Sequence, residues 1–400
     1  MSVRKSDVVI VGGGIAAYAA TAAIAERGGQ REVVIVSDED RLPYRRTKIS
    51  KRLAEGFTAD ELALQPADWY GRNRTYLHLN NTAVAIDPKT RVLTLSDGSE
   101  LSWKFLVLAT GASPVIPRLP GFAEGTRQGR IFVIRTAADA ERLRAAAQGR
   151  RTAIVAGAGV LGIEVAEQLS KIGLGVILVE RMGRVMPADL DEEASATLAE
   201  LLSANGIELH MNRSAWRLNV GSLKEIVLET TEEQLRADIA VFCLGSFPRI
   251  ELADKAGLAV QRGISVDDRL RTSHPRIFAA GDAAMQADGR VTHLWYAAER
   301  QGEIVGANLC GEPLKYENLP FRLKMEVFGH YFFSMRWIWS GNGRGKRLVR
   351  TSGSISQSFL FHEGRLAGVV MIDDKARAEV YKRAVLDRVG LAHVDQLLGL

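Results

Sequence analysis

The stretch Val8–Ala17, VVIVGGGIAA, passes from four apolar residues directly into three glycines. A second stretch, Ala153–Gly162, repeats this design as AIVAGAGVLG. Each apolar run is typical of a buried strand. The glycines at its end allow a tight turn into a helix whose N-terminus can meet a dinucleotide pyrophosphate. Two such fingerprints predict two dinucleotide sites, and the chemistry that needs both in one chain is hydride transfer between a nicotinamide and a flavin.

The residues after each fingerprint predict a βαβ unit. In the first unit we expect a helix over Ile15–Arg27 and a strand over Val33–Val36. In the second unit the matching helix and strand are expected over Leu161–Ile172 and Val176–Val179. The short crossovers favour parallel sheets. The predicted fold class is therefore α/β, with two Rossmann-like dinucleotide-binding domains of three-layer ββα architecture.

Turn-rich segments and a change of composition divide the chain further. Thr110–Pro114 is expected as a turn that opens a crossover between domains, and Gly245–Pro248 as the turn of the return crossover. From about Pro320 the sequence becomes aromatic and basic, which indicates a small α+β domain. We therefore expect a first dinucleotide domain formed by residues 1–115 and 246–319, a second over 116–245, and a C-terminal domain over 320–400.

The composition is that of a soluble globular protein, with 46% hydrophobic and 25% charged residues. The net charge of +5 suits an acidic protein partner, and because the sequence carries no nucleic-acid-binding motif we expect no nucleic acid partner. The uncharged stretch Val8–Ala25 is broken by its glycines, so it is not expected to be a signal peptide or a membrane span. We expect a cytoplasmic protein without membrane contact, either a monomer or a homodimer.

Two cysteines, Cys243 and Cys310, lie far apart in the sequence and form no C-x-x-C pair. This spacing argues against a redox-active disulfide and against a cysteine metal site, and we predict no metal site elsewhere. Cys243 follows an apolar run and is expected to be a buried structural thiol. The low cysteine content is consistent with a reducing compartment.

Acidic residues follow the second strand of each βαβ unit. Glu180 comes directly after Val179, where a carboxylate would accept both ribose hydroxyls of an adenosine and repel a 2′-phosphate. This favours NADH, although Arg181 and Arg184 could instead hold that phosphate and leave NADPH open. The alternative for Glu180 is a solvated charge at the strand end.

In the first unit the corresponding residues are Asp38 and Glu39, whose alternative is a simple acidic loop. Gly281-Asp282 follows the short apolar strand expected from Ile277. A carboxylate there could reach the ribityl chain of a flavin, although Gly-Asp is also common in turns.

Further motifs accompany the fingerprints, and the whole set resembles the FAD-dependent pyridine-nucleotide oxidoreductases. Within that superfamily it is most similar to the ferredoxin and rubredoxin reductases, the flavin part of NADH-nitrite reductases and apoptosis-inducing factor. The shared motifs are Ala109–Gly111, Gly245 with Pro248, Thr272–Pro275 leading into Gly281-Asp282, and Leu42–Tyr44 with Arg46 and Ile49–Lys51. The chain departs from the family at Thr47-Lys48, where two prolines are usual, and at Val115, where an arginine is frequent.

The resemblance implies FAD in the first unit and NADH, with NADPH left open, in the second. The residues implied for the FAD site are Gly12, Gly14, Ala17, Asp38, Glu39, Arg46, Lys51, Val84, Ala109, Gly111, Asp282, Trp295 and Ala297. Those implied for the NAD(P)H site are Gly157, Gly159, Val160, Leu161, Gly162, Glu164, Glu180, Arg181 and Gly245. Members that reduce disulfides use a cysteine near the end of residues 42–50, which this chain lacks, so electrons are not expected to pass through a thiol.

Lys51 and Glu164 match a lysine–glutamate pair that family members place beside the flavin N5 and the nicotinamide. A lysine there would stabilise electron density that enters the isoalloxazine, and the glutamate would orient the lysine and the carboxamide. The alternative is a surface lysine and a glutamate favoured by the helix dipole.

The resemblance implies hydride transfer from NADH to flavin N5, then release of single electrons to a small acidic redox protein such as a ferredoxin or rubredoxin. One alternative is direct reduction of a small acceptor such as oxygen, a quinone or a nitrite-type system. Another is an NADH-sensing flavoprotein with a binding or signalling role. The basic run Arg344–Arg350 could dock an acidic partner or form a solvated hairpin, and the aromatic stretch Phe328–Trp339 is expected to be the core of a small sheet.

Overall fold

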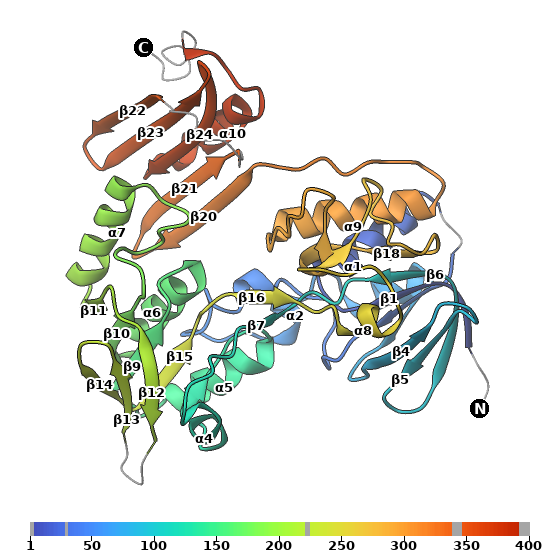
Figure 1. The fold of residues 1–400 in the computed structure, drawn as a ribbon, viewed down its shortest axis with the longest axis horizontal. Helices are drawn as coiled ribbons and strands as arrows, with labels where there is room; N and C mark the ends of the chain where they lie inside the picture. The colour runs from blue at the N-terminus through green and yellow to red at the C-terminus, as the bar shows by residue number, and fades with distance from the viewer. Residues whose placement is uncertain (1–3, 29–30, 221–224, 338–345, 392–400) are drawn as a thin grey trace. The chain divides into compact units, whose positions relative to one another are not determined.

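A computed structural model describes residues 4–28, 31–220, 225–337 and 346–391. Of Lys346 it describes the backbone but not the side chain. The chain divides into two compact units (Figure 1). Unit 1 comprises Met1–Val115, Arg135–Ala137 and Gly245–Glu317, and unit 2 comprises Ile116–Ile134, Ala138–Leu244 and Asn318–Leu400. Unit 2 thus contains nearly all of the stretches predicted as the second dinucleotide domain and the C-terminal domain, and the division into three domains stays a prediction.

The predicted α/β class is confirmed, and unit 1 is built on a largely parallel sheet. Strands β3, β2, β1, β6 and β18 lie side by side in parallel, and β5 and β4 continue from β6 as an antiparallel meander. Val8, Val9 and Ile10 of β1 are completely buried, as a strand paired on both sides and covered on both faces requires. The strands of unit 1 are β1 (Arg4–Val11), β2 (Val33–Val36), β3 (Thr75–His78), β4 (Ala83–Asp87), β5 (Val92–Leu95), β6 (Glu100–Leu108), β7 (Ala112–Pro114), β16 (Ser246–Pro248), β17 (Ile264–Ser265), β18 (Ile277–Ala279) and β19 (Ala284–Met285).

Two helices pack closely against each other over the sheet of unit 1. A Cβ at Gly302 of α9 would overlap the carbonyl oxygen of Ala16 in α1, and one at Gly306 would overlap that of Ala20. Glycine is therefore required for this close approach. The helices of unit 1 are α1 (Ile15–Glu26), α2 (Ala59–Leu62), α3 (Ala67–Arg72), α8 (Glu251–Lys255) and α9 (Trp295–Leu309), with single 3₁₀ turns η1 (Arg46–Lys48) and η2 (Gly281–Ala283).

Unit 2 repeats the plan of the first dinucleotide fold and adds an antiparallel sheet. Its parallel sheet has the order β11-β10-β9-β15-β8, and β12, β13 and β14 form a separate antiparallel meander. The strands are β8 (Ile131–Phe132), β9 (Thr152–Ala156), β10 (Gly175–Val179), β11 (Ile207–His210), β12 (Ala215–Asn219), β13 (Ile226–Thr230), β14 (Gln234–Ala237) and β15 (Ile239–Phe242). The helices are α4 (Phe122–Arg127), α5 (Ala137–Ala147), whose first residue belongs to unit 1, α6 (Val160–Ile172) and α7 (Glu192–Ala204).

The C-terminal part of unit 2 is a five-stranded antiparallel sheet with the order β20-β21-β24-β23-β22 and one covering helix. The aromatic stretch contributes to its core, since Tyr331, Phe332 and Phe333 are buried; Trp339 lies outside the described residues. The elements are β20 (Phe321–Val327), β21 (His330–Arg336), β22 (Lys346–Ser352), β23 (Ile355–His362), β24 (Arg365–Ile372), the 3₁₀ turn η3 (Lys375–Arg377) and α10 (Ala378–Leu386).

The two crossover segments differ from the prediction of plain turns. β7, inside the predicted turn Thr110–Pro114, pairs antiparallel with β16, inside the predicted turn Gly245–Pro248. The two passes of the chain thus satisfy one another's backbone hydrogen bonds, which local sequence does not reveal. No helix of the described ranges is long and apolar enough to cross a membrane.

Candidate functional site

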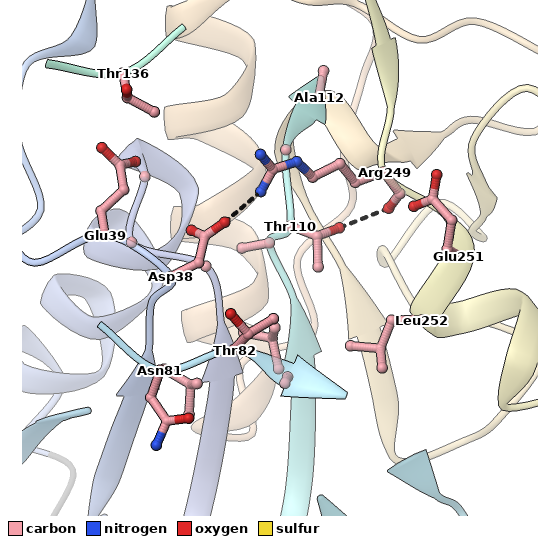
Figure 2. Close-up of a pocket in the computed structure, with 18 of the residues that line it drawn as sticks. Asp38, Glu39, Asn81, Thr82, Thr110, Ala112, Thr136, Arg249, Glu251 and Leu252 are labelled. Carbon is pink, nitrogen blue, oxygen red and sulfur yellow. Dashed lines mark hydrogen bonds and ion pairs between the residues drawn. The ribbon is translucent and has the colours of Figure 1, made fainter. Parts of the chain in front are cut away.

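A cavity of about 390 Å³ opens in unit 1 where the parallel strands end (Figure 2). Val11 and Val36 are the last residues of β1 and β2, and both line it. The crevice at the carboxyl ends of parallel strands is the usual ligand site of a doubly wound sheet. The lining also includes Gly12, Gly13, Gly14, Asp38, Glu39, Arg46, Asn81, Thr82, Ala83, Val84, Ala109, Thr110, Gly111, Ala112, Arg135, Thr136, Arg249, Glu251, Leu252 and Lys255.

The first glycine loop is shaped for a ligand that approaches the backbone. A Cβ at Gly12, which has φ +117°, would overlap the carbonyl oxygen of Ala109, so the chain itself requires this glycine. Gly14 differs: its backbone is extended, and apart from its neighbours along the chain no heavy atom of the described residues lies within 4 Å of a Cβ built there. Gly14 caps α1 with no side chain of its own, so it leaves the helix N-terminus accessible. These residues fit a dinucleotide pyrophosphate.

The second glycine loop, in unit 2, has the same construction. A Cβ at Gly157 would overlap the carbonyl oxygen of Cys243, and one at Gly162 would overlap that of Gly157. Gly159 caps α6 in an extended conformation, and within the described part of the chain nothing lies within 4 Å of a Cβ built there. Unit 2 therefore carries a second open helix N-terminus that fits a dinucleotide.

Three arginine–carboxylate pairs of unit 1 lie at the cavity. The pairs are Arg46 Nη2 to Glu39 Oε1 at 2.5 Å, Arg135 Nη2 to Asp282 Oδ2 at 3.1 Å, and Arg249 Nη1 to Asp38 Oδ2 at 2.9 Å. Burial lowers the pKa of Arg135, and the positive charges of Arg46 and Arg249 lower it further, while Asp282 opposes them. Arg135 is thus close enough to Arg46 and to Arg249 to be repelled by both, and its carboxylate partner Asp282 offsets that repulsion.

The family follows from the comparison of the sequence with known proteins. Residues 6–302, which carry both glycine loops and the cavity, match the pyridine nucleotide-disulphide oxidoreductase family. The chain belongs to this family. It is an NAD(P)H-dependent flavoprotein oxidoreductase, and its cofactors are FAD and NAD(P)H. The residues of both loops fit these dinucleotides.

Relatives of this oxidoreductase include two reductases from Pseudomonas putida. The chain is 28% identical to the ferredoxin–NAD(+) reductase subunit of a benzene 1,2-dioxygenase system, over 92% of this chain and 89% of the relative. It is 32% identical to a rubredoxin-NAD(+) reductase, over 76% and 80%. Among solved structures, a covalent putidaredoxin reductase–putidaredoxin complex gives a TM-score of 0.88 at 25% identity, covering 96% of this chain and 94% of that chain.

Not every residue that the sequence suggested for FAD lies at the cavity. Those that line it are Gly12, Gly14, Asp38, Glu39, Arg46, Val84, Ala109 and Gly111. Asp282 is connected to it through Arg135. Ala17 and Ala297 are buried within α1 and α9, Trp295 is half-buried at the start of α9, and Lys51 is exposed after η1. These four residues are not among the described lining residues.

Sequence reasoning missed several lining residues, above all Arg135 and Arg249. Both lie where the chain crosses between stretches of different units, and no local periodicity marks them. For Arg249, its place directly after Pro248 at the end of the return crossover is the sequence feature that could have indicated a role at the cavity. Thr110 Oγ1 donates a hydrogen bond of 2.8 Å to the carbonyl oxygen of Arg249, which ties the crossover to the end of β6.

Glu180 of this oxidoreductase lies beside the second glycine loop. Its carboxylate accepts hydrogen bonds of 2.8 Å from the N–H groups of Ala158 and Met182. Arg184 donates to the carbonyl oxygens of Leu190 at 2.9 Å and Pro187 at 3.0 Å, so its guanidinium braces its own loop. Arg181, by contrast, is exposed.

Cys243 follows β15 and is partly rather than fully buried, because the chain turns outward there toward the exposed Leu244. Burial of the sulfur and the negative charge of Glu164 raise the pKa of its thiol to about 12. The thiol is therefore protonated at neutral pH and a poor nucleophile. Glu164 is itself buried on α6. Its predicted pairing with Lys51, which belongs to unit 1, stays a prediction.

Proposed function

We propose that this oxidoreductase takes hydride from NADH and delivers electrons to a small acidic redox protein of the ferredoxin or rubredoxin class. The observation that carries the proposal is the pair of open helix N-termini at Gly14 and Gly159, one in each unit. The names of the relatives, a ferredoxin reductase and a rubredoxin reductase, support the acceptor class. The sequence offers no cysteine pair for a thiol relay.

Each dinucleotide is assigned to one loop. We assign FAD to the cavity of unit 1, where the loop at Gly12–Gly14 and the arginines provide donors for a diphosphate. We assign NADH to the loop at Gly157–Gly162 of unit 2. Bound FAD supplies the conversion of a two-electron hydride into single-electron transfers. We keep the three domains expected from the sequence, and the domain that contains the unit 1 cavity is the FAD domain.

Glu180 sets the preference for NADH in this proposal. Its carboxylate follows β10, where the ribose of a bound adenosine would hydrogen-bond to it, and its negative charge would repel a 2′-phosphate. Arg184 donates to three backbone carbonyl oxygens, which leaves its guanidinium less able to bind the 2′-phosphate of NADPH. Arg181 is the remaining basic residue suggested for that phosphate.

Lys51 and Glu164 are the proposed catalytic residues. The positive charge of Lys51 would favour added electron density on the neighbouring flavin, and Glu164 would orient the nicotinamide carboxamide. Burial of Glu164 fits a fixed orientation of its carboxylate. The roles rest on the family resemblance of their positions.

The docking surface for the acceptor is proposed on the basic C-terminal part of the chain. Arg347 is less available than the sequence suggests, because it pairs with Asp191 at 2.9 Å and Glu193 at 3.1 Å. Arg344 lies outside the described residues. Among the side chains of this run that the structure describes, Arg350 of β22 is left for this role.

The proposal is tested by purification and half-reactions. The protein should be yellow with one non-covalent FAD per chain, and under anaerobic conditions NADH should reduce it faster than NADPH. Mixing the reduced protein with ferredoxin or rubredoxin should reoxidise it rapidly. A colourless protein that fails to take up FAD on reconstitution would end the proposal, and equally fast reoxidation by oxygen or a quinone would favour the small-acceptor alternative.

A further inference from the structure

Arg249 is anchored at the end of the return crossover, where the chain re-enters unit 1. The backbone N–H of Arg249 donates to the carbonyl oxygen of Gly111 at 2.9 Å, and the carbonyl oxygen of Arg249 accepts from Thr110 Oγ1 at 2.8 Å. Figure 2 shows the side chain reaching over the cavity toward Asp38. The segment that carries the chain back into unit 1 therefore places a guanidinium at the dinucleotide pocket.

Two further hydrogen bonds fix the direction of this guanidinium. Nη1 donates to Asp38 Oδ2 at 2.9 Å, and Nε donates to Ser113 Oγ at 3.0 Å. A guanidinium carries five N–H donors in a rigid fork, so these bonds engage two of them. Because the side chain is already ordered, binding an anion with the remaining donors costs little conformational entropy.

The pocket presents several guanidinium groups to a bound anion. Arg46, Arg135 and Arg249 line the same cavity, each held by one carboxylate. Glu251 and Lys255 add one lining charge of each sign. A diphosphate would accept hydrogen bonds from these guanidinium forks in pairs.

We propose that Arg249 is a third cationic ligand of the dinucleotide diphosphate in the unit 1 cavity, held ready by Asp38 and Ser113. The proposal rests on the assignment of FAD to this cavity. It adds a consequence for the fold, because cofactor binding would stabilise the paired crossover strands β7 and β16 that carry Ser113 and lead into Arg249.

The affinity of the apoprotein for FAD tests this role without any turnover. Titration of apoprotein, followed by quenching of flavin fluorescence, should show that Arg249→Gln raises the Kd for FAD about 10- to 100-fold, the change expected for one charge-assisted hydrogen bond. The Kd of Arg249→Lys should lie between those of the wild type and Arg249→Gln, because lysine keeps the positive charge but lacks the forked N–H donors of a guanidinium. The matched control is Arg300→Gln on α9, which removes the same charge from an exposed pair with Glu303. Its Kd should equal that of the wild type.

A double-mutant cycle separates contact with the diphosphate from support of Asp38. In an Asp38→Asn background, Arg249→Gln should still raise the Kd at least about tenfold, and the salt dependence of FAD binding should become shallower. If its effect vanishes in that background, Arg249 only positions Asp38 and the proposal is wrong.

Two further outcomes are decisive. Wild-type affinity in Arg249→Gln would overturn the role of Arg249 while leaving the proposed function intact, whereas failure of the wild type to bind FAD would overturn the proposed function itself. Should Arg249→Gln apoprotein melt far below the wild type, Arg249→Lys serves as the deciding variant. Its Kd must then exceed that of the wild type.

Discussion

Gly159→Ala is expected to weaken nucleotide binding to unit 2 while leaving the stability of its fold nearly unchanged. The backbone at Gly159 is extended, with φ −82° and ψ −176°, a conformation that alanine adopts freely. Among the described residues nothing lies within 4 Å of the new methyl group. The added methyl group would therefore meet the nucleotide proposed to bind there rather than the protein.

The expected changes in stability and in NADH affinity can both be given a size. Alanine is a poorer helix N-cap than glycine, by up to about 1 kcal/mol. It also loses less chain entropy on folding, by about 0.4–1 kcal/mol. The free energy of unfolding should therefore change by less than about 1 kcal/mol. Loss of one charge-assisted hydrogen bond to the pyrophosphate is worth about 1.5–3 kcal/mol, so the Kd for NADH should rise about 10- to 100-fold.

Urea unfolding, FAD content and calorimetric titration of the dithionite-reduced protein with NADH measure these quantities on one preparation. Gly162→Ala is the matched comparison, because its methyl group would overlap the carbonyl oxygen of Gly157 inside the fold. That variant should lose stability by about 1–3 kcal/mol or more. Wild-type affinity for NADH in stable Gly159→Ala would refute the assignment of this loop as the nucleotide site.

Other predictions concern the proposed chemistry. Lys51→Ala and Glu164→Ala should each slow flavin reduction, measured by stopped flow, with FAD still bound. If the two residues act as one unit, the double variant should lose less transition-state stabilisation than the sum of the two single losses, whereas additive losses would show that they act independently. Replacement of Cys243 and Cys310 by serine should leave NADH-dependent flavin reduction nearly intact, because the raised pKa of the Cys243 thiol keeps this thiol protonated. A large loss of hydride transfer in a folded protein would reveal a thiol step. Glu180→Gln, which keeps an oxygen acceptor for the N–H of Ala158, should narrow the preference of flavin reduction for NADH over NADPH; an unchanged ratio would assign the preference to another residue.

The glycine fingerprints were predictable because closely spaced glycines after an apolar run are a local pattern. The contacts that require them are only partly local, since a Cβ at Gly162 would overlap the nearby carbonyl oxygen of Gly157 but one at Gly12 would overlap that of the distant Ala109. Apolar runs such as Val8–Val11 identify buried parallel strands for the same reason. Both dinucleotide folds could therefore be inferred from the sequence.

Contacts between distant segments could not be predicted in the same way. Arg249 reaches Asp38 across 211 positions of sequence, and Arg135 reaches Asp282 across 147. The pairing of β7 with β16 involves three residues on each side, too few to show a strand pattern. The interior positions of Ala17 and Ala297 likewise depend on packing that no motif specifies.

Electron delivery to a redox protein is tested most directly by anaerobic mixing of the NADH-reduced protein with ferredoxin or rubredoxin over a range of ionic strength. Because the chain is basic, the rate of reoxidation should fall as salt rises from about 0.02 to 0.3 M, while reduction by NADH changes little. Arg350→Glu should lower the rate at low salt in the same direction. Reoxidation that is slow with both redox proteins, or indifferent to salt and to Arg350→Glu, would contradict a protein acceptor docked by charge.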